Sequence, residues 1–209
     1  MGSFKVILDL DDFSLENNNL YFLDQLKRVY PQLKVSLFYI PFDVAYFMTL
    51  KDVQRKEVLQ MVKDRLDWIE LIPHGLTHKE AEFLHVKDDN YEPIFEAVEE
   101  AYKTYDLPLV KGFKAPQWLY KQNLVDYLNK KGWWMAVDKN QPEAPRTKIY
   151  YEYSHSIDEP IGKQKDGSIL KLHGHISKPS ANDLPSNIGN LLNIPTDAQF
   201  MFISEYLAT

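Results

Sequence analysis

Short apolar runs alternate with helical patterns along most of the chain. Eight runs, each four to seven residues long and rich in β-branched and aromatic side chains, favour buried strands. They cover residues 4–10, 35–40, 68–72, 110–113, 133–137, 149–153, 169–173 and 199–203. Between most of them, apolar residues recur every three or four positions, as at Leu20, Leu23 and Leu26, which predicts amphipathic helices. The predicted helices cover residues 20–29, 53–66, 94–105, 124–131 and 184–192.

Alternating strands and helices are typical of βα units around a parallel sheet. The chain has no long linker, internal repeat or low-complexity tract, so residues 1–209 are expected to form a single domain. In parallel α/β barrels, functional side chains collect where the strands end and the following loops begin. Polar residues at the predicted strand ends are therefore the candidates for chemistry.

Composition narrows the function classes. The formal net charge of −6 and the lack of a basic stripe argue against a nucleic-acid partner. No apolar run approaches the ~20 residues of a membrane helix, and the N-terminal residues do not form a secretory signal, so we expect a cytoplasmic protein. The chain contains no cysteine, which leaves histidines and carboxylates as metal ligands.

Two polar motifs directly follow predicted strands. The first holds Asp9, Asp11 and Asp12, and burying three carboxylates together is costly unless they are paired or bind a cation. Its alternative interpretation is a solvated acidic turn or a helix N-cap. The second motif holds His74 and His78, which are expected on one side of a helical turn, where two imidazoles can meet one Zn²⁺. Such a pair is otherwise a common surface feature.

Two further strand ends carry basic groups. Lys114 follows the predicted strand at 110–113 and precedes a turn, where a solvated lysine is the simpler interpretation. His173 and His175 lie two residues apart at the end of another strand, so both are expected on the same face. One of them alone would be explained as a hydrogen-bonded core histidine, but two on one face indicate a polar site.

Taken together, these motifs and their order resemble the polysaccharide deacetylase family, also called the NodB-homology family or carbohydrate esterase family 4. The match extends from about residue 4 to residue 175, and its most specific segment is Glu-Leu-Ile-Pro-His-Gly-Leu-Thr-His at 70–78. The resemblance implies an α/β fold in the form of a distorted (β/α) barrel of about seven parallel strands. It also implies a zinc site, or another divalent transition metal such as Co²⁺, Mn²⁺ or Ni²⁺, and hydrolysis of the N-acetyl group of an amino sugar or related small amide.

The resemblance also assigns roles to individual residues. The metal ligands it implies are Asp12, His74 and His78. Asp11 corresponds to the general base and His173 to the general acid. Lys114 occupies the position of a catalytic arginine, and Asp138, after the strand at 133–137, corresponds to an acidic residue that supports the site.

Three positions depart from the family pattern. Phe13 replaces a glycine after the aspartate pair, and Lys114 replaces an arginine, which removes a planar bidentate contact to the base. Gly174 replaces the aspartate that follows the acid histidine, so the residue expected to orient His173 is missing and His175 becomes a rival for its role.

Two alternative functions remain open at this stage. A haloacid-dehalogenase-like phosphatase would use Asp9 as nucleophile and Asp11 as acid and base, although that class expects a threonine where the chain has Phe13. The substitutions at Lys114 and Gly174 instead favour a deacetylase-like barrel that binds a glycan without hydrolysing it.

Overall fold

The computed structural model describes residues 4–45, 50–177 and 180–209. The strands are β1 (Lys5–Phe13), β2 (Val35–Tyr39), β3 (Ile69–Pro73), β4 (Gly112–Lys114), β5 (Trp134–Val137), β6 (Tyr150–Glu152), β7 (His155–Ser156), β8 (Ile169–His175) and β9 (Gln199–Phe200). The helices are α1 (Leu20–Val29), α2 (Asp52–Lys63), α3 (Glu92–Thr104), α4 (Gln122–Lys131), α5 (Leu184–Leu191) and α6 (Ile203–Leu207). Two short 3₁₀ helices, η1 (Lys87–Asp89) and η2 (Pro116–Trp118), lie in the loops.

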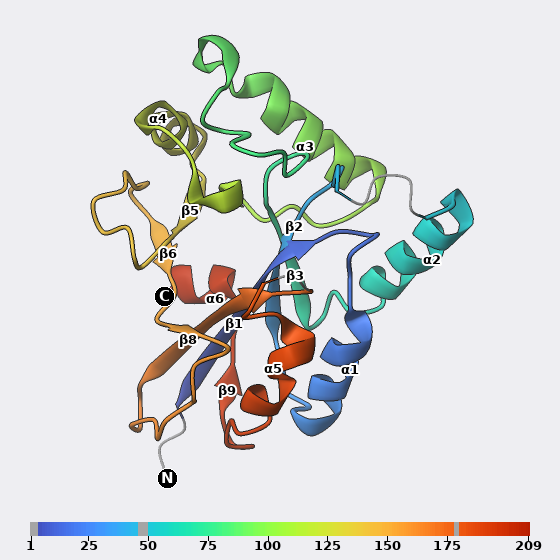
Figure 1. Cartoon of the computed structure of the whole chain (residues 1–209), viewed down its shortest axis with the longest axis vertical. Coiled ribbons are helices and arrows are strands. Elements are labelled where there is room, and N and C mark those ends of the chain that lie inside the picture. The colour runs from blue at the N-terminus through green and yellow to red at the C-terminus, as the bar shows by residue number, and fades with distance from the viewer. Residues whose placement is uncertain (1–3, 46–49, 178–179) are drawn as a thin grey trace.

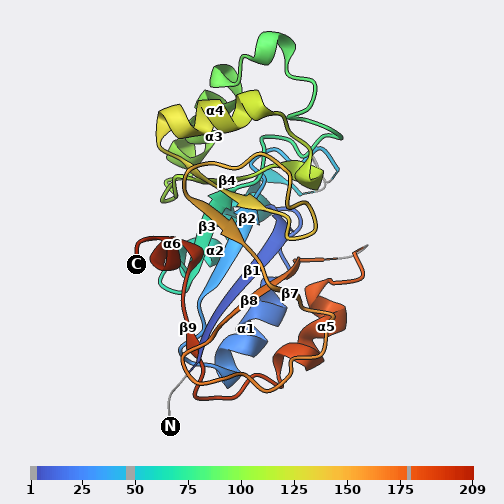
Figure 2. The ribbon, with the colours of Figure 1, turned by 90° about the vertical axis from the view of Figure 1, so that its left-hand side faces the viewer.

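The strands form two parallel sheets. The larger sheet has the order β3-β2-β1-β8-β7, with β9 also paired to β1, and the smaller has the order β4-β5-β6. Every strand pair in both sheets is parallel. Helices α1, α2 and α5 lie on one side of the larger sheet and α6 on the other (Figure 1). Helices α3 and α4 lie beside the smaller sheet, as the turned view shows (Figure 2).

Strand β1 lies between two hydrophobic clusters because its side chains alternate between its faces. Val6, Leu8 and Leu10 face the large core that α1 and α5 cover. Ile7 faces a second cluster, which includes Tyr151 of β6 and side chains of α6. The alternation places the next two residues of that inner face, Asp9 and Asp11, among buried side chains of both sheets.

The structure confirms the parallel α/β class and the predicted succession of strands and helices. It does not confirm the barrel, because the described strands form two sheets with no hydrogen-bonded ladder that joins them into a closed one. The segment predicted as a strand at 199–203 contains only the two residues of β9 before α6 begins at Ile203. Among the described residues, none of the helices is both long and apolar enough to cross a membrane.

Candidate active site and metal centre

A bulge near the end of β1 presents the aspartate pair. Leu10 pairs with Leu37 of β2, but Phe13 pairs with Tyr39, so three residues of β1 match two of β2. The extra residue falls at the pair, and Asp12 has a φ of 63°. A bulge of this kind re-aims a side chain that a regular strand would direct to the opposite face. Both carboxylates can therefore reach one site although they are adjacent in sequence.

The structure brings together Asp12, His74 and His78. The Oδ1 atom of Asp12 lies 3.4 Å from Nε2 of His74 and 3.1 Å from Nε2 of His78. Burial raises the pKa of Asp12, but its hydrogen bonds to both histidines outweigh this and hold the pKa well below its usual range. Burial likewise lowers the pKa of His78, but the Asp12 carboxylate outweighs it and raises that pKa.

The donor set of these three residues fits a divalent metal. Each offers one ligand atom, and the three atoms lie within 4.8 Å of one another. The Nδ1 atom of His74 lies 3.0 Å from the carbonyl oxygen of Lys114, which only accepts, so Nδ1 carries a hydrogen and Nε2, which faces Asp12, is the ring atom that can bind a metal. A histidine held in this way by a backbone carbonyl is the usual arrangement at metal sites.

The formal charges around this site favour a single cation. Asp9, Asp11 and Asp12 contribute three negative charges and Lys114 one positive charge, which leaves two negative charges. A cation at the metal-ligand group would offset this negative charge. A second group of possible ligands, made of Asp11, His173 and His175, lies beside the first, but a second divalent ion there would have to compete with the ammonium group of Lys114.

Asp11 is buried beside Lys114. The Lys114 Nζ atom donates to Oδ1 of Asp11 at 2.6 Å, and both side chains are at most 5% exposed. Nζ also lies 3.8 Å from the centre of the Trp118 ring. Burial raises the pKa of Asp11, but Lys114 and then the neighbouring histidines outweigh it and lower the pKa to about 2. The second oxygen, Oδ2, lies 3.9 Å from Nε2 of His74 and 3.9 Å from Nε2 of His173.

His173 is oriented by Asp9, so the expectation that its partner is missing is wrong. Asp9 and His173 are neighbours across the β1–β8 ladder, and Nδ1 of His173 lies 2.7 Å from Oδ1 of Asp9. The hydroxyl of Tyr151 donates to the other Asp9 oxygen at 2.9 Å. Gly174 stands where the family pattern has an aspartate, and Asp9 of the neighbouring strand makes the contact to the histidine instead.

The contacts described for Asp138 are with residues around the site rather than with the proposed base, acid or metal ligands. Its Oδ1 atom accepts hydrogen bonds from the Tyr153 hydroxyl and from Asn140. The Tyr153 ring packs against the ring of His173, with 4.6 Å between the centroids. Among the contacts that the structure describes, Asp138 thus reaches His173 through Tyr153.

His175 also faces the site and is fixed by Asn182. Its Nδ1 atom lies 2.8 Å from Oδ1 of Asn182, and its backbone N–H donates to the Asn182 carbonyl at 3.0 Å. Its Nε2 atom lies 4.0 Å from Oδ2 of Asp12. Burial lowers the pKa of His175, which favours the neutral ring. His175 thus lies between the metal-ligand group and Asp11, because its ligand atom is also within 4.8 Å of those of Asp11 and His173.

The segment that links His74 to His78 is not helical. It is a loop in which Gly75 has a φ of 74° and His78 a φ of 56°. The prediction that the two histidines share one side of a helical turn is therefore wrong. They approach each other because the loop folds back, with 5.0 Å between the ring centroids.

The same geometry argues against the phosphatase alternative. Asp9, its required nucleophile, is 1% exposed and accepts hydrogen bonds with both oxygens. A nucleophilic carboxylate needs an oxygen that can approach the substrate phosphorus, and neither oxygen of Asp9 is free to do so.

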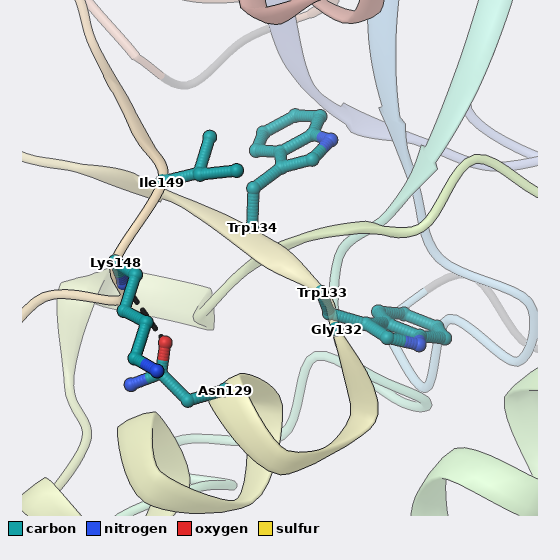
Figure 3. A pocket seen from close by; sticks show the side chains of 6 residues that line it. All are labelled: Asn129, Gly132, Trp133, Trp134, Lys148 and Ile149. Carbon is teal, nitrogen blue, oxygen red and sulfur yellow. Dashed lines mark hydrogen bonds between the residues drawn. The ribbon is translucent and has the colours of Figure 1, made fainter.

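A pocket at the opposite end of the smaller sheet offers no comparable chemistry (Figure 3). It is lined by Asn129, Gly132, Trp133, Trp134, Lys148 and Ile149, and lies at the amino end of β5. Neither a carboxylate nor an imidazole is among these side chains. The candidate site instead lies at the carboxyl ends of the strands, as expected for a parallel α/β protein.

Comparison with known proteins finds similarity to solved structures. No protein-family model and no curated protein matches the sequence. Among solved structures, the chitin deacetylase of the fungus Colletotrichum lindemuthianum matches with a TM-score of 0.61 at 14% identity, over 98% of this chain and 86% of that one. The CE4 domain of a xylanase from the hindgut metagenome of Trinervitermes trinervoides matches with a TM-score of 0.59 at 16% identity, over 99% and 90%.

A third match is a CE4 pseudoenzyme from Bacillus anthracis, with a TM-score of 0.56 at 14% identity, over 99% of this chain and 65% of that one. At these identities the similarity establishes the fold. Since enzymes and a pseudoenzyme share it, catalysis has to be argued from the side chains of the site.

Proposed function

We propose that the protein is a metal-dependent hydrolase that removes an acyl group, in particular an acetyl group, from the nitrogen of an amino sugar or a related small amide. The observation that supports this most directly is the position of Asp11. Its Oδ2 atom is 3.9 Å from Nε2 of His74, a proposed metal ligand, and 3.9 Å from Nε2 of His173, the proposed acid. A base, an acid and a metal-ligand group thus surround one small volume.

Asp12, His74 and His78 would hold the metal. When bound there, Zn²⁺ or a related ion supplies a Lewis acid that polarises a carbonyl group and makes water more acidic. Two imidazoles and one carboxylate leave coordination positions open for this purpose, as in catalytic rather than structural zinc sites. The deacetylases with the same fold support this assignment.

Asp11 acts as the general base. It takes a proton from the attacking water on Oδ2, while the water oxygen forms the new bond to the acyl carbon. Lys114 holds Oδ1 at 2.6 Å, so the carboxylate cannot turn and Oδ2 stays directed at the site. The low pKa of Asp11 keeps the carboxylate ionised at neutral pH, the form that a general base requires.

His173 acts as the general acid. An amide nitrogen is a poor leaving group until it is protonated, so the C–N bond breaks as Nε2 of His173 gives it a proton. Asp9 accepts from Nδ1 at 2.7 Å, which directs Nε2 toward Asp11 and stabilises the doubly protonated ring. The products are a carboxylic acid and an amine.

Acetate release tests the proposal. The purified protein should release acetate from an oligomer of N-acetylglucosamine and from an aryl acetate. A chelator should abolish both activities, and added Zn²⁺ should restore them. Asp11→Asn serves as the matched control, because it preserves the shape of the site but removes the base. A chain that binds the oligomer without releasing acetate, even when loaded with metal, would instead support the non-catalytic alternative.

A further inference from the structure

The loop that carries His78 folds around the side chain of Glu82. Three consecutive backbone N–H groups converge on this carboxylate, from Leu76 at 3.1 Å, Thr77 at 3.1 Å and His78 at 3.0 Å. The Thr77 hydroxyl donates to it as well, at 3.2 Å. Successive N–H groups arranged in this way form a concave binding site for an anion, and here the anion is supplied by the chain itself.

The loop has a conformation that is uncommon without such support. His78 has a φ of 56°, in the left-handed region that non-glycine residues seldom occupy. Gly75 has a φ of 74°, and a Cβ atom added there would lie 2.5 Å from Oε2 of Glu82 and 2.8 Å from Pro116. The Glu82 carboxylate therefore fills the space that the loop surrounds.

This conformation determines where the His78 imidazole lies. The backbone N–H of His78 donates to Oε2 of Glu82, while its Nε2 atom lies 3.1 Å from Oδ1 of Asp12. His74, in contrast, directly follows β3, and its ring is held by the Lys114 carbonyl. Of the two histidines, only His78 depends on the loop for its position.

We propose that Glu82 is a positioning residue that holds His78 in place for the metal and thereby sets the metal affinity. This inference rests on the metal site of the proposed function. Without the Glu82 carboxylate, the N–H groups of residues 76–78 turn to water and the loop samples other conformations. The observed Kd then rises in inverse proportion to the fraction of molecules in which His78 is in place.

The test is the Zn²⁺ dissociation constant, measured by competition with a chelator. Glu82→Ala should raise Kd about 10- to 100-fold, the usual effect of removing a residue that supports a metal ligand. Glu82→Gln keeps one accepting oxygen and should show a smaller rise. The matched control is Glu80→Ala, which removes the same charge from an exposed position two residues earlier and should leave Kd within about twofold.

A double-mutant cycle separates positioning from a general structural role. If Glu82 acts through His78, then Glu82→Ala should change Kd by less than about twofold once His78 is already alanine. If Glu82→Ala raised Kd by the same factor with and without the His78 side chain, the inference would be overturned. A wild-type chain that binds no Zn²⁺ would overturn the metal site and this inference with it, whereas tight wild-type binding that is unaltered by Glu82→Ala would overturn only this inference. If Glu82→Ala does not fold, Glu82→Gln provides the test, and an unchanged Kd there has the same meaning.

Discussion

Nδ1 of His173 lies 2.7 Å from Oδ1 of Asp9, and the two residues face each other across neighbouring parallel strands. The carboxylate is buried and also accepts a hydrogen bond from Tyr151, so its position is fixed by three elements, β1, β6 and β8. It supplies the orienting contact that Gly174 cannot. The substitution at Gly174 therefore does not by itself indicate an inactive site.

Asp9→Asn should impair the hydrolysis of amides far more than that of activated esters. An asparagine can offer its NH₂ group to Nδ1, which then acts as an acceptor and carries no hydrogen. The ring stays neutral, and the Nε2–H of a neutral imidazole is a far weaker acid than that of the doubly protonated ring. We expect kcat on an N-acetylated sugar to fall by about 10²-fold or more, within the range for loss of general acid catalysis. Tyr151→Phe, which removes only the second hydrogen bond to Asp9, should have a much smaller effect. Equal losses on both substrates in Asp9→Asn would contradict the role.

Asp11→Asn should keep the metal but lose hydrolysis of amide and ester substrates alike. Asparagine has nearly the same shape but cannot accept the proton, and a general base contributes about 10²–10⁴-fold. Metal content and kcat, measured on the same preparation, check this. Turnover at the wild-type rate would exclude Asp11 as the base.

His173→Ala should spare an activated aryl ester while it cripples amide hydrolysis. A phenolate leaves without a proton, whereas an amine does not. Loss of the acid therefore lowers the rate only for the substrate with the poorer leaving group. His175→Ala is the matched comparison, since that side chain lies on the same strand face but beside Asp12. If only the His175 variant showed the selective loss, the roles of the two histidines would be exchanged.

Lys114→Met should destabilise the protein by about 3–5 kcal/mol at neutral pH, because it leaves a buried carboxylate without its partner. The folded-state pKa of Asp11 is lowered to about 2 from an ordinary value of 3.8, so this carboxylate contributes stability above about pH 4 that is lost as the pH falls toward 2. The difference in unfolding free energy between the variant and the wild type should therefore shrink over that range. Urea unfolding at several pH values measures it.

The double variant Asp11→Asn, Lys114→Met is the control for this effect. It removes both charges and should recover much of the lost stability, although not the activity. A double variant no more stable than Lys114→Met would show that Lys114 contributes mainly by packing against Trp118 and Phe38 rather than by its charge.

Local patterns were enough to predict much of this fold. The spacing of Leu20, Leu23 and Leu26 predicts α1, because these residues form one buried face. The bulge in β1 could not be predicted, since it depends on pairing with β2. Pairing between strands distant in the sequence also decides which carboxylate meets His173, so the residues next to that histidine gave no indication of Asp9.

The histidine pair shows a second limit. Spacing alone places His74 and His78 on one side of a helix, but the loop takes another path because Glu82 binds its N–H groups. A glutamate four residues after a histidine is unremarkable in a sequence. Its importance becomes visible only when the three N–H groups are seen to converge on it.

The bulge in β1 fixes the number of residues that can separate Asp9 from Asp12. Asp9 and Asp11 are in register with His173 and His175, and Asp12 is turned by the one extra residue. One residue inserted or deleted between them would move the following side chains to the opposite face of the strand. Asp9 could then no longer contact His173 while Asp12 contacts His74 and His78. Surface loops elsewhere can change in length at little cost, but the length of this segment sets the positions of the site residues. A homologue with the proposed activity should therefore vary in its loop lengths while keeping the two residues between these aspartates.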